Sequence, residues 1–343
     1  MNRESNLVDI VIPEKIEIIN NLTESFKAHQ VLIAALEVGL FDWIYENGES
    51  TREEIIEGIK INGMFSRSFL STLLSLGFLQ LNSDKYTNTE VTNKFLVSKS
   101  KYYQGNWIKR NTGSSSKWNN LKDNIIAKEE NDSTSDDNLE LSLIKGLQER
   151  SLRGELQNIV GHVTSWNGFS KSKKILDMGD EYGLYSIALS QLNSNLTGTI
   201  LSNSHDIKVT EKYIAKYNLA NKLKILQNDA TSNEIDANND IVLVSHSLYK
   251  HRKKLGDIFD NINKLLKEGG LAVFNHWFCG PGCGSSNGLK ELDKSLFSGG
   301  HPLCHSEKFA KLLEDYGFEL IKTLDIPSYN GISKLHMAIK IKE

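Results

Sequence analysis

Apolar residues recur at helical spacing near the start of the chain, between Lys15 and Tyr45. The stripe they form is broad, which is typical of a helix buried on more than one side. Its members are Val31, Leu32, Ala34, Ala35, Leu36, Val38, Leu40 and Phe41. After Gly48, the run from Ser50 to Glu54 places acidic residues behind a hydroxyl residue, which predicts the capped start of another helix.

The next apolar residues predict a helix from about Ser66 to Leu76, ended by Gly77, and then a hairpin that turns at Asn82–Asp84. Helices followed by a short hairpin are the winged-helix arrangement, which often binds DNA. Residues 1–100, however, carry nine Lys and Arg against fourteen Asp and Glu, a net charge of −5 that a DNA duplex would repel. We therefore interpret the apolar stripe as a subunit interface.

Residues 101–170 have mixed helical character around a polar loop at Asn131–Asn138, and they are expected to link two domains and to roof a pocket. From residue 171 to 343, short apolar runs alternate with helical segments, which predicts a mostly parallel sheet covered on both faces. The runs are Lys174–Met178, Thr199–Leu201, Leu223–Leu226, Ile241–Ser245, Leu271–Phe274, Glu319–Leu324 and Leu335–Ile341. The last two, joined by Pro327–Gly331, are expected to form an antiparallel hairpin at the sheet edge.

Composition narrows the choice of partners. The formal charge of −3 and a pI near 6.3 give no reason to expect nucleic acid or an anionic membrane as a partner. No apolar stretch has the length of a signal peptide or a membrane span, so we expect a cytoplasmic protein. The three cysteines are too few and too clustered for a disulfide framework. A small-molecule substrate and a second protein subunit remain the expected partners.

The segment Lys174–Leu189 has the outline of a loop that holds a nucleotide-type cofactor. An apolar strand reaches Asp177, Gly179 and Gly183 bracket a turn, and a helix begins after them. Glycines let the backbone approach a ligand there, and the free amides of the helix start face it. Glu181 stands where a further glycine is expected, either as a solvated loop residue or as a carboxylate that repels the cofactor's own.

Several segments, in this order and spacing, resemble the dimeric class I O-methyltransferases that act on small molecules, and the resemblance covers nearly the whole chain. The segments are Val31–Ile44, Thr51–Ile59, Phe69–Val97, Lys101–Trp107, the loop at Asp177, Leu265–Phe274 and Ser298–Phe318. The resemblance implies an α/β fold, in which an N-terminal, mainly α-helical winged-helix dimerisation domain precedes a Rossmann-like methyltransferase domain with a mostly parallel seven-stranded sheet.

The resemblance also implies a pocket for S-adenosylmethionine at the carboxyl ends of the strands. The residues it places there are Asp177, Gly179, Glu181, Gly183, Ser202, Asn203, Asp229, Ala230 and Ser245. Ser202 and Asn203 replace the acidic residue that normally binds the ribose hydroxyls. Asp229 keeps the family's position beside the adenine amine.

The family's catalytic base is a histidine after the fourth strand, and Tyr249 stands at its position in this chain. A neutral tyrosine is a poor base near pH 7, because its reference pKa is about 10. His251 follows two residues later and is a candidate to replace it. His246, directly after the strand, is interpreted as part of the pocket wall.

A cluster of histidine and cysteine residues follows the fifth strand. His276 is a candidate to orient or deprotonate the acceptor, and Cys279 is a candidate for an approachable thiol beside the substrate pocket. The remaining members are Cys283, His301, Cys304 and His305. Their spacing is not that of a known structural metal site, so we assign no metal.

The first hypothesis is therefore a homodimeric methyltransferase that uses S-adenosylmethionine to methylate a small aromatic or planar metabolite, most simply on oxygen. Catalysis would come mainly from holding the acceptor in line with the methyl group. Two alternatives remain open. One is an enzyme of this fold that has lost methyl transfer and uses the histidine and cysteine residues for cyclisation, elimination or metal-assisted chemistry. The other is a binding protein that senses a metabolite.

Overall fold

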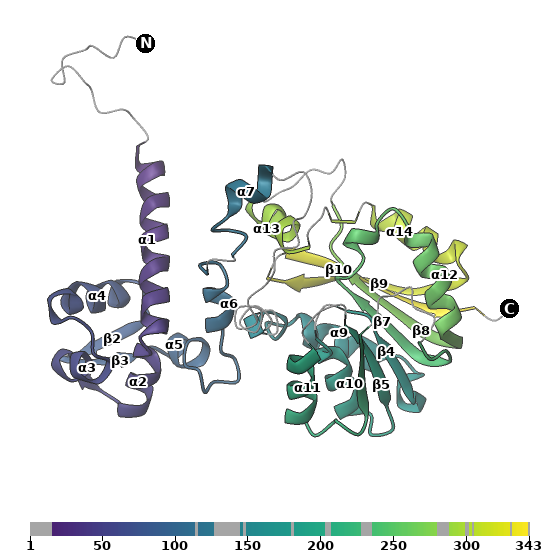
Figure 1. The fold of residues 1–343 in the computed structure, drawn as a ribbon, viewed down its shortest axis with the longest axis horizontal. Coiled ribbons are helices and arrows are strands. Elements are labelled where there is room, and N and C mark those ends of the chain that lie inside the picture. The colour runs from purple at the N-terminus through teal and green to yellow at the C-terminus, as the bar shows by residue number, and fades with distance from the viewer. Residues whose placement is uncertain are drawn as a thin grey trace, which may run out of the picture. The chain divides into compact units, whose positions relative to one another are not determined.

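The computed structural model describes residues 16–113, 116–126, 145–146, 149–179, 182–202, 207–227, 235–279, 288–298, 302–303, 305–329 and 331–341. The chain divides into two compact units, residues 1–108 and residues 109–343 (Figure 1). None of the helices in the described ranges is both long and apolar enough to cross a membrane.

The first unit is mainly helical and contains a small antiparallel sheet of order β1-β3-β2. Its elements are α1 (Glu17–Glu37), α2 (Leu40–Asn47), β1 (Ser50–Thr51), α3 (Arg52–Ile59), α4 (Gly63–Ser75), β2 (Leu79–Asn82), β3 (Lys85–Asn88) and α5 (Glu90–Phe95), while α6 (Gly105–Lys109) ends at the boundary. The predicted capped helix start is confirmed: the Glu54 backbone N–H donates to Thr51 Oγ1, and Glu54 Oε2 accepts from the Thr51 N–H at 2.7 Å. The predicted hairpin is β2 and β3.

The apolar stripe of α1 and α2 packs mainly within its own unit. Ala35, Leu40 and Phe41 are buried in the core of this unit, together with residues of α3, α4 and β2. The interpretation of this stripe as a subunit interface is therefore wrong for these three residues, because the unit's own helices already cover them. The exposed apolar side chains of α1 lie nearer its start, where Leu22 is 74% exposed and Phe26 is 63% exposed.

The second unit contains a seven-stranded sheet of order β6-β5-β4-β7-β8-β10-β9. Its strands are β4 (Lys174–Asp177), β5 (Thr197–Ser202), β6 (Leu223–Gln227), β7 (Asn239–Ser245), β8 (Leu266–His276), β9 (Phe318–Ser328) and β10 (Gly331–Lys340). The first five are parallel, and β10 runs antiparallel to both β8 and β9. This confirms the predicted fold class and the closing hairpin. The hairpin connection is shorter than predicted, since Pro327 belongs to β9.

Helices cover both faces of this sheet (Figure 1). One face carries α9 (Glu155–Thr164), α10 (Leu184–Leu192) and α11 (Ile207–Lys216), and the other carries α12 (Leu255–Leu265) and α14 (Ser306–Asp315). The unit also contains α7 (Leu121–Ile126) and α13 (Gly288–Ser298). Every residue of β7 is buried, as expected for a central strand between two helical layers. The strand order reverses between β4 and β7, and in open α/β sheets ligands bind beside the carboxyl ends of strands at such a reversal.

Candidate functional site

The carboxyl ends of β4 and β7 lie side by side at the reversal of strand order. Asp177 ends β4 and pairs with Leu243, two residues before Ser245 ends β7. The loop after β4 passes directly over this end of β7, because a Cβ added to Gly179 would lie 3.3 Å from the Cβ of Ser245. Glycine at position 179 therefore permits a close approach between the loop and the end of β7.

Asp177 fixes the loop to the helix that follows it. Its side chain is 1% exposed; Oδ1 accepts from the Gly179 N–H at 3.1 Å and Oδ2 accepts from Ser186 Oγ at 2.9 Å. Gly183 has φ 77° immediately before α10, and a Cβ there would lie within 2.4 Å of the Ile200 side chain. Only glycine fits this backbone conformation and this space. The loop thus delivers the start of α10, whose first amides lack carbonyl partners within the helix itself, to the carboxyl edge.

The structure describes only some of the other residues predicted to bind the cofactor. Ser202 ends β5 and is 9% exposed, and Ser245 is 1% exposed. The Ser245 hydroxyl has no hydrogen-bond partner among the described residues. A buried hydroxyl without a partner is uncommon and marks a position where a ligand or water can bind. The remaining predicted residues lie outside the described part of the chain: Glu181, Asn203, Asp229 and Ala230.

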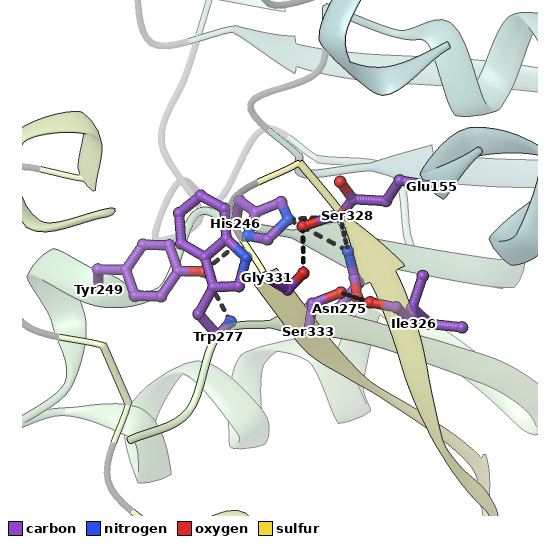
Figure 2. A network of polar contacts seen from close by, with 9 residues as sticks. All are labelled: Glu155, His246, Tyr249, Asn275, Trp277, Ile326, Ser328, Gly331 and Ser333. Carbon is purple, nitrogen blue, oxygen red and sulfur yellow. Dashed lines mark hydrogen bonds and ion pairs between the residues drawn. The ribbon is translucent and has the colours of Figure 1, made fainter. Parts of the chain in front are cut away.

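Directly beyond Ser245, three side chains form a buried polar network (Figure 2). Glu155 comes from the first turn of α9, His246 follows β7 and Asn275 lies near the end of β8. Glu155 Oε1 is 2.7 Å from His246 Nε2 and 2.7 Å from Asn275 Nδ2. All three side chains are at most 2% exposed. The neighbouring strands β7 and β8 present their side chains to a single carboxylate.

Tyr249 extends this network toward β8. Its hydroxyl lies 2.6 Å from His246 Nδ1 and accepts from the Trp277 backbone N–H at 2.9 Å (Figure 2). The ring of Trp277 packs against both rings, with its centroid 4.2 Å from that of His246 and 5.7 Å from that of Tyr249. The described contacts therefore join the Tyr249 phenol, the His246 imidazole and the Glu155 carboxylate in one hydrogen-bonded chain.

The backbone turns sharply at His246 to make this arrangement. His246 has φ 53°, a left-handed conformation that is uncommon for residues other than glycine, and its N–H donates to the Asn275 carbonyl at 2.9 Å. This hydrogen bond extends the β7–β8 pairing by one residue, and the His246 side chain points toward Glu155. Backbone strain of this kind is concentrated at functional sites in proteins.

The charge on Glu155 determines the direction of the bond between Glu155 and His246. Burial by itself raises the pKa of Glu155, but the positive charge that His246 carries when protonated, the charge of Arg150 and the bonds from His246 and Asn275 outweigh burial and hold the pKa at about 2. Glu155 is therefore ionised at neutral pH, and His246 Nε2 carries the proton that it donates to this carboxylate. In the neutral form of this imidazole Nδ1 is an acceptor, to which the Tyr249 O–H can donate. Arg150 is itself 2% exposed and stacks over Trp277 at 5.7 Å.

The four predicted catalytic residues differ in their surroundings. Tyr249 belongs to the network, whereas His251, at the end of the same short turn, is half-buried and makes none of the network's bonds. His276 is fully buried, and neither ring nitrogen has a partner among the described residues. Cys279 is partly exposed, and its N–H donates to the Leu303 carbonyl.

No group of three potential metal ligands occurs among the described residues. Of the cysteine and histidine residues around Cys279, the following lie outside those ranges: Cys283, His301 and Cys304.

Glu155 and Asn275 are not predicted from the sequence, and His246 is predicted only as a wall. An acidic residue in the first turn of a helix is common, because it complements the helix dipole, so Glu155 gives no distinctive signal. Asn275 does give one: an amide interrupts the otherwise apolar, buried run of β8. Buried polar side chains in such a run require a partner, and this one finds Glu155.

A third buried histidine, His336 on β10, makes stability depend on pH. Burial and the nearby Lys334 lower the pKa of His336 from 6.5 to about 4. The unfolded chain therefore gains this proton below about pH 6.5, whereas the folded protein gains it only near pH 4. Stability that is present above pH 6.5 is lost as the pH falls through this window, by roughly 3 kcal/mol for this residue.

We expect urea denaturation at pH 8, 6.5, 5 and 4 to show this loss, and His336→Gln to reduce it. Burial also holds the pKa of His276 well below its usual range, so part of the loss will remain in the variant. Above pH 7 the two proteins should show parallel stability curves. An equal slope in both proteins between pH 6.5 and 4 would contradict the assignment to His336.

Comparisons with known proteins agree with this architecture. The family model of the O-methyltransferase dimerisation domain matches residues 20–98. An uncharacterised protein of Methanocaldococcus jannaschii is 25% identical over 342 residues, which cover 94% of this chain and 89% of that protein.

Solved structures share the fold over the whole length of the chain. An O-methyltransferase family protein from Burkholderia thailandensis has a TM-score of 0.79 at 16% identity, covering 97% of this chain and 99% of that one. Human N-acetylserotonin methyltransferase, in complex with S-adenosylmethionine, has a TM-score of 0.75 at 16% identity, with 100% of both chains covered. Residues 20–98 thus match the O-methyltransferase dimerisation domain, and the chain as a whole shares the fold of these methyltransferase structures.

Proposed function

We propose that this protein is a homodimeric methyltransferase that transfers a methyl group from S-adenosylmethionine to an oxygen of a small, planar metabolite. The observation that carries the proposal is the position of the polar network. It begins at His246, one residue beyond Ser245, where the loop after β4 crosses the end of β7. A loop suited to a nucleotide-type cofactor and a group suited to accept a proton thus stand side by side.

The residues of the loop fit the cofactor. Gly179 brings the backbone close to the Ser245 hydroxyl, which is buried and has no partner among the described residues. Asp177 and Gly183 hold the start of α10 in place, so that its first amides face the carboxyl edge. When bound, the cofactor supplies an electrophilic methyl group on a sulfonium centre. This chain's own residues position it and exclude water.

Tyr249 is the catalytic residue that we favour, in preference to the other three candidates. It is the one bonded to a buried imidazole that can receive a proton. His251 and Cys279 make no bond to Glu155 or His246, and the ring of His276 contacts Tyr249 with 5.6 Å between centroids. We place His276 beside the acceptor, as a neutral group that helps to orient it.

Calorimetry with S-adenosylmethionine and S-adenosylhomocysteine tests the proposal. We expect both to bind the protein, and Gly179→Val to abolish binding by filling the space over Ser245. The matched control is Gly161→Val on the exposed side of α9, where an added Cβ meets nothing within 4 Å. No binding at millimolar cofactor would overturn the proposal and favour an enzyme of this fold without methyl transfer.

The exposed apolar face of α1 supports the homodimer. Ile18, Leu22 and Phe26 recur four residues apart, so they share one face, and each is more than 60% exposed. Patches of this kind mark protein interfaces, and α1 lies within the range matched by the dimerisation-domain family for most of its length. We propose that a second copy of the chain covers this face.

We expect Leu22→Glu combined with Phe26→Glu to convert the dimer into a monomer, because burying two carboxylates at an apolar contact is unfavourable. Light scattering after size-exclusion chromatography measures the change. Asn21→Glu, on the same exposed helix but off the apolar face, is the control and should remain dimeric. A dimer that survives the double substitution would place the interface elsewhere.

A further inference from the structure

The network contains a phenol that is hydrogen-bonded to an imidazole whose other nitrogen is held by a carboxylate. Tyr249 Oη lies 2.6 Å from His246 Nδ1, and His246 Nε2 lies 2.7 Å from Glu155 Oε1. The same order of groups, a reacting hydroxyl, an imidazole and an orienting carboxylate, activates hydroxyl groups in many enzymes. Here the terminal hydroxyl belongs to tyrosine, which on its own is a poor base at neutral pH.

We propose that His246 and Glu155 are positioning residues that make Tyr249 an effective base toward the acceptor hydroxyl. The inference rests on the proposed function, since it describes how that reaction disposes of its proton. The acceptor O–H gives its proton to Tyr249 Oη while the phenolic proton moves to His246 Nδ1. As the oxygen lone pair bonds to the methyl carbon, the carbon–sulfur bond would break and its electron pair would stay on sulfur. The positive charge lost there reappears on the His246 imidazolium, so charge and protons balance.

Glu155 stabilises the imidazolium formed in this step. Its carboxylate is 2% exposed and stays ionised throughout the neutral range, because its pKa is about 2. A fixed negative charge 2.7 Å from Nε2 acts strongly in a site closed to water. Asn275 donates to the same oxygen and keeps the carboxylate from rotating. Arg150 lies over the Trp277 ring, and its positive charge lowers the pKa of Glu155. The charge of Arg150 therefore favours the ionised form of the Glu155 carboxyl group.

We call the hydrogen-bonded chain from Tyr249 through His246 to Glu155 the relay. Trp277 holds the Tyr249 end of the relay in place. Its backbone N–H donates to Tyr249 Oη at 2.9 Å, so the phenol oxygen keeps its O–H directed at His246. A hydrogen bond donated to the oxygen also stabilises the negative charge that develops there as the proton leaves. The phenol is therefore held at both its oxygen and its proton before the acceptor arrives.

The first test needs no acceptor. Nitrogen-15 NMR of histidine-labelled protein reports which imidazole nitrogen carries the proton. We expect the His246 signals, assigned by their loss in His246→Gln, to show a neutral ring protonated at Nε2 and unprotonated at Nδ1 near pH 7.5. A ring protonated at Nδ1, or an imidazolium at that pH, would overturn the proposal, because Nδ1 could then accept nothing.

The second test compares two acceptor probes, phenol and 4-nitrophenol, with labelled S-adenosylmethionine. Nitrophenol is already ionised in mildly alkaline buffer and needs no base. We expect His246→Gln and Glu155→Gln to lower phenol methylation by about 10²-fold or more while nitrophenol methylation changes much less. In His246→Gln, the rate with phenol should keep rising toward pH 10, since the tyrosine must then ionise unaided. Asp260→Asn, exposed on α12, is the unchanged control.

Equal losses for the two probes would show a structural role and overturn the inference. Where neither probe is methylated, the tautomer found by NMR decides. Calorimetry with S-adenosylhomocysteine on each variant keeps the two proposals apart. Failure of the unmodified protein to bind it counts against the proposed function, whereas retained binding with an unselective loss of rate counts only against the relay.

Discussion

Replacing Tyr249 by Phe is expected to lower methyl transfer to a phenolic acceptor by about 10²–10⁴-fold, the range found when a general base is removed. The phenyl ring keeps the contacts with Trp277 and His276, so packing changes little. What is lost is the oxygen that links the acceptor to His246. The effect should appear in kcat, with the affinity for S-adenosylhomocysteine within about twofold of that of the unmodified protein.

Rates with labelled S-adenosylmethionine and thermal unfolding of the same samples check this prediction. Tyr217→Phe, an exposed position after α11, is the matched control and should retain full activity. A rate for Tyr249→Phe within threefold of the unmodified protein would remove Tyr249 from the mechanism and return attention to His251 or His276.

Replacing Glu155 by Ala is expected to cost about 3–5 kcal/mol of the free energy of unfolding. The substitution removes the shared acceptor of two buried donors, His246 Nε2 and Asn275 Nδ2. It also removes the buried negative charge with which Arg150 interacts. Buried donors without partners carry their full desolvation cost, so the loss exceeds that of an ordinary hydrogen bond.

Urea denaturation of the two proteins at pH 7.5 measures the difference. The control is Asp260→Ala, which breaks an exposed pair with Lys264 on α12 and should cost about 0.3–0.5 kcal/mol. Glu155→Gln should lose less than Glu155→Ala, because an amide oxygen can still accept from Asn275. A loss below 1 kcal/mol for Glu155→Ala would mean that other groups or water satisfy both donors.

The sheet could be predicted because its strands carry compact apolar runs. Ile241–Val244 is apolar throughout and lies in the fully buried β7, and each of the seven predicted runs lies within a strand of one sheet or extends one residue beyond its end. The limits of the strands were less predictable. β8 begins at Leu266, five residues before its apolar run, since the single pairing of Leu266 with Asn239 and the irregularity that follows it leave no mark in side-chain polarity.

The site could be predicted only where it depends on local geometry. Gly179 and Gly183 were identifiable because a tight turn beside a strand demands glycine, and the structure gives the reason in their contacts with Ser245 and Ile200. The role of the apolar stripe on α1 and α2 was not identifiable, because the same pattern fits an interface and a core. The partner of Tyr249 was hidden for another reason: the left-handed backbone at His246 redirects a side chain that strand alternation would place elsewhere.

The network also has a consequence for the order of folding. Glu155 is separated from His246 by 91 positions and from Asn275 by 120. Contacts between residues so far apart in sequence close large loops, and they form after the local helices and hairpins. The bonds that build the proposed reaction centre are therefore among the last to form. We expect substitutions in it to accelerate unfolding while leaving the rate of refolding nearly unchanged.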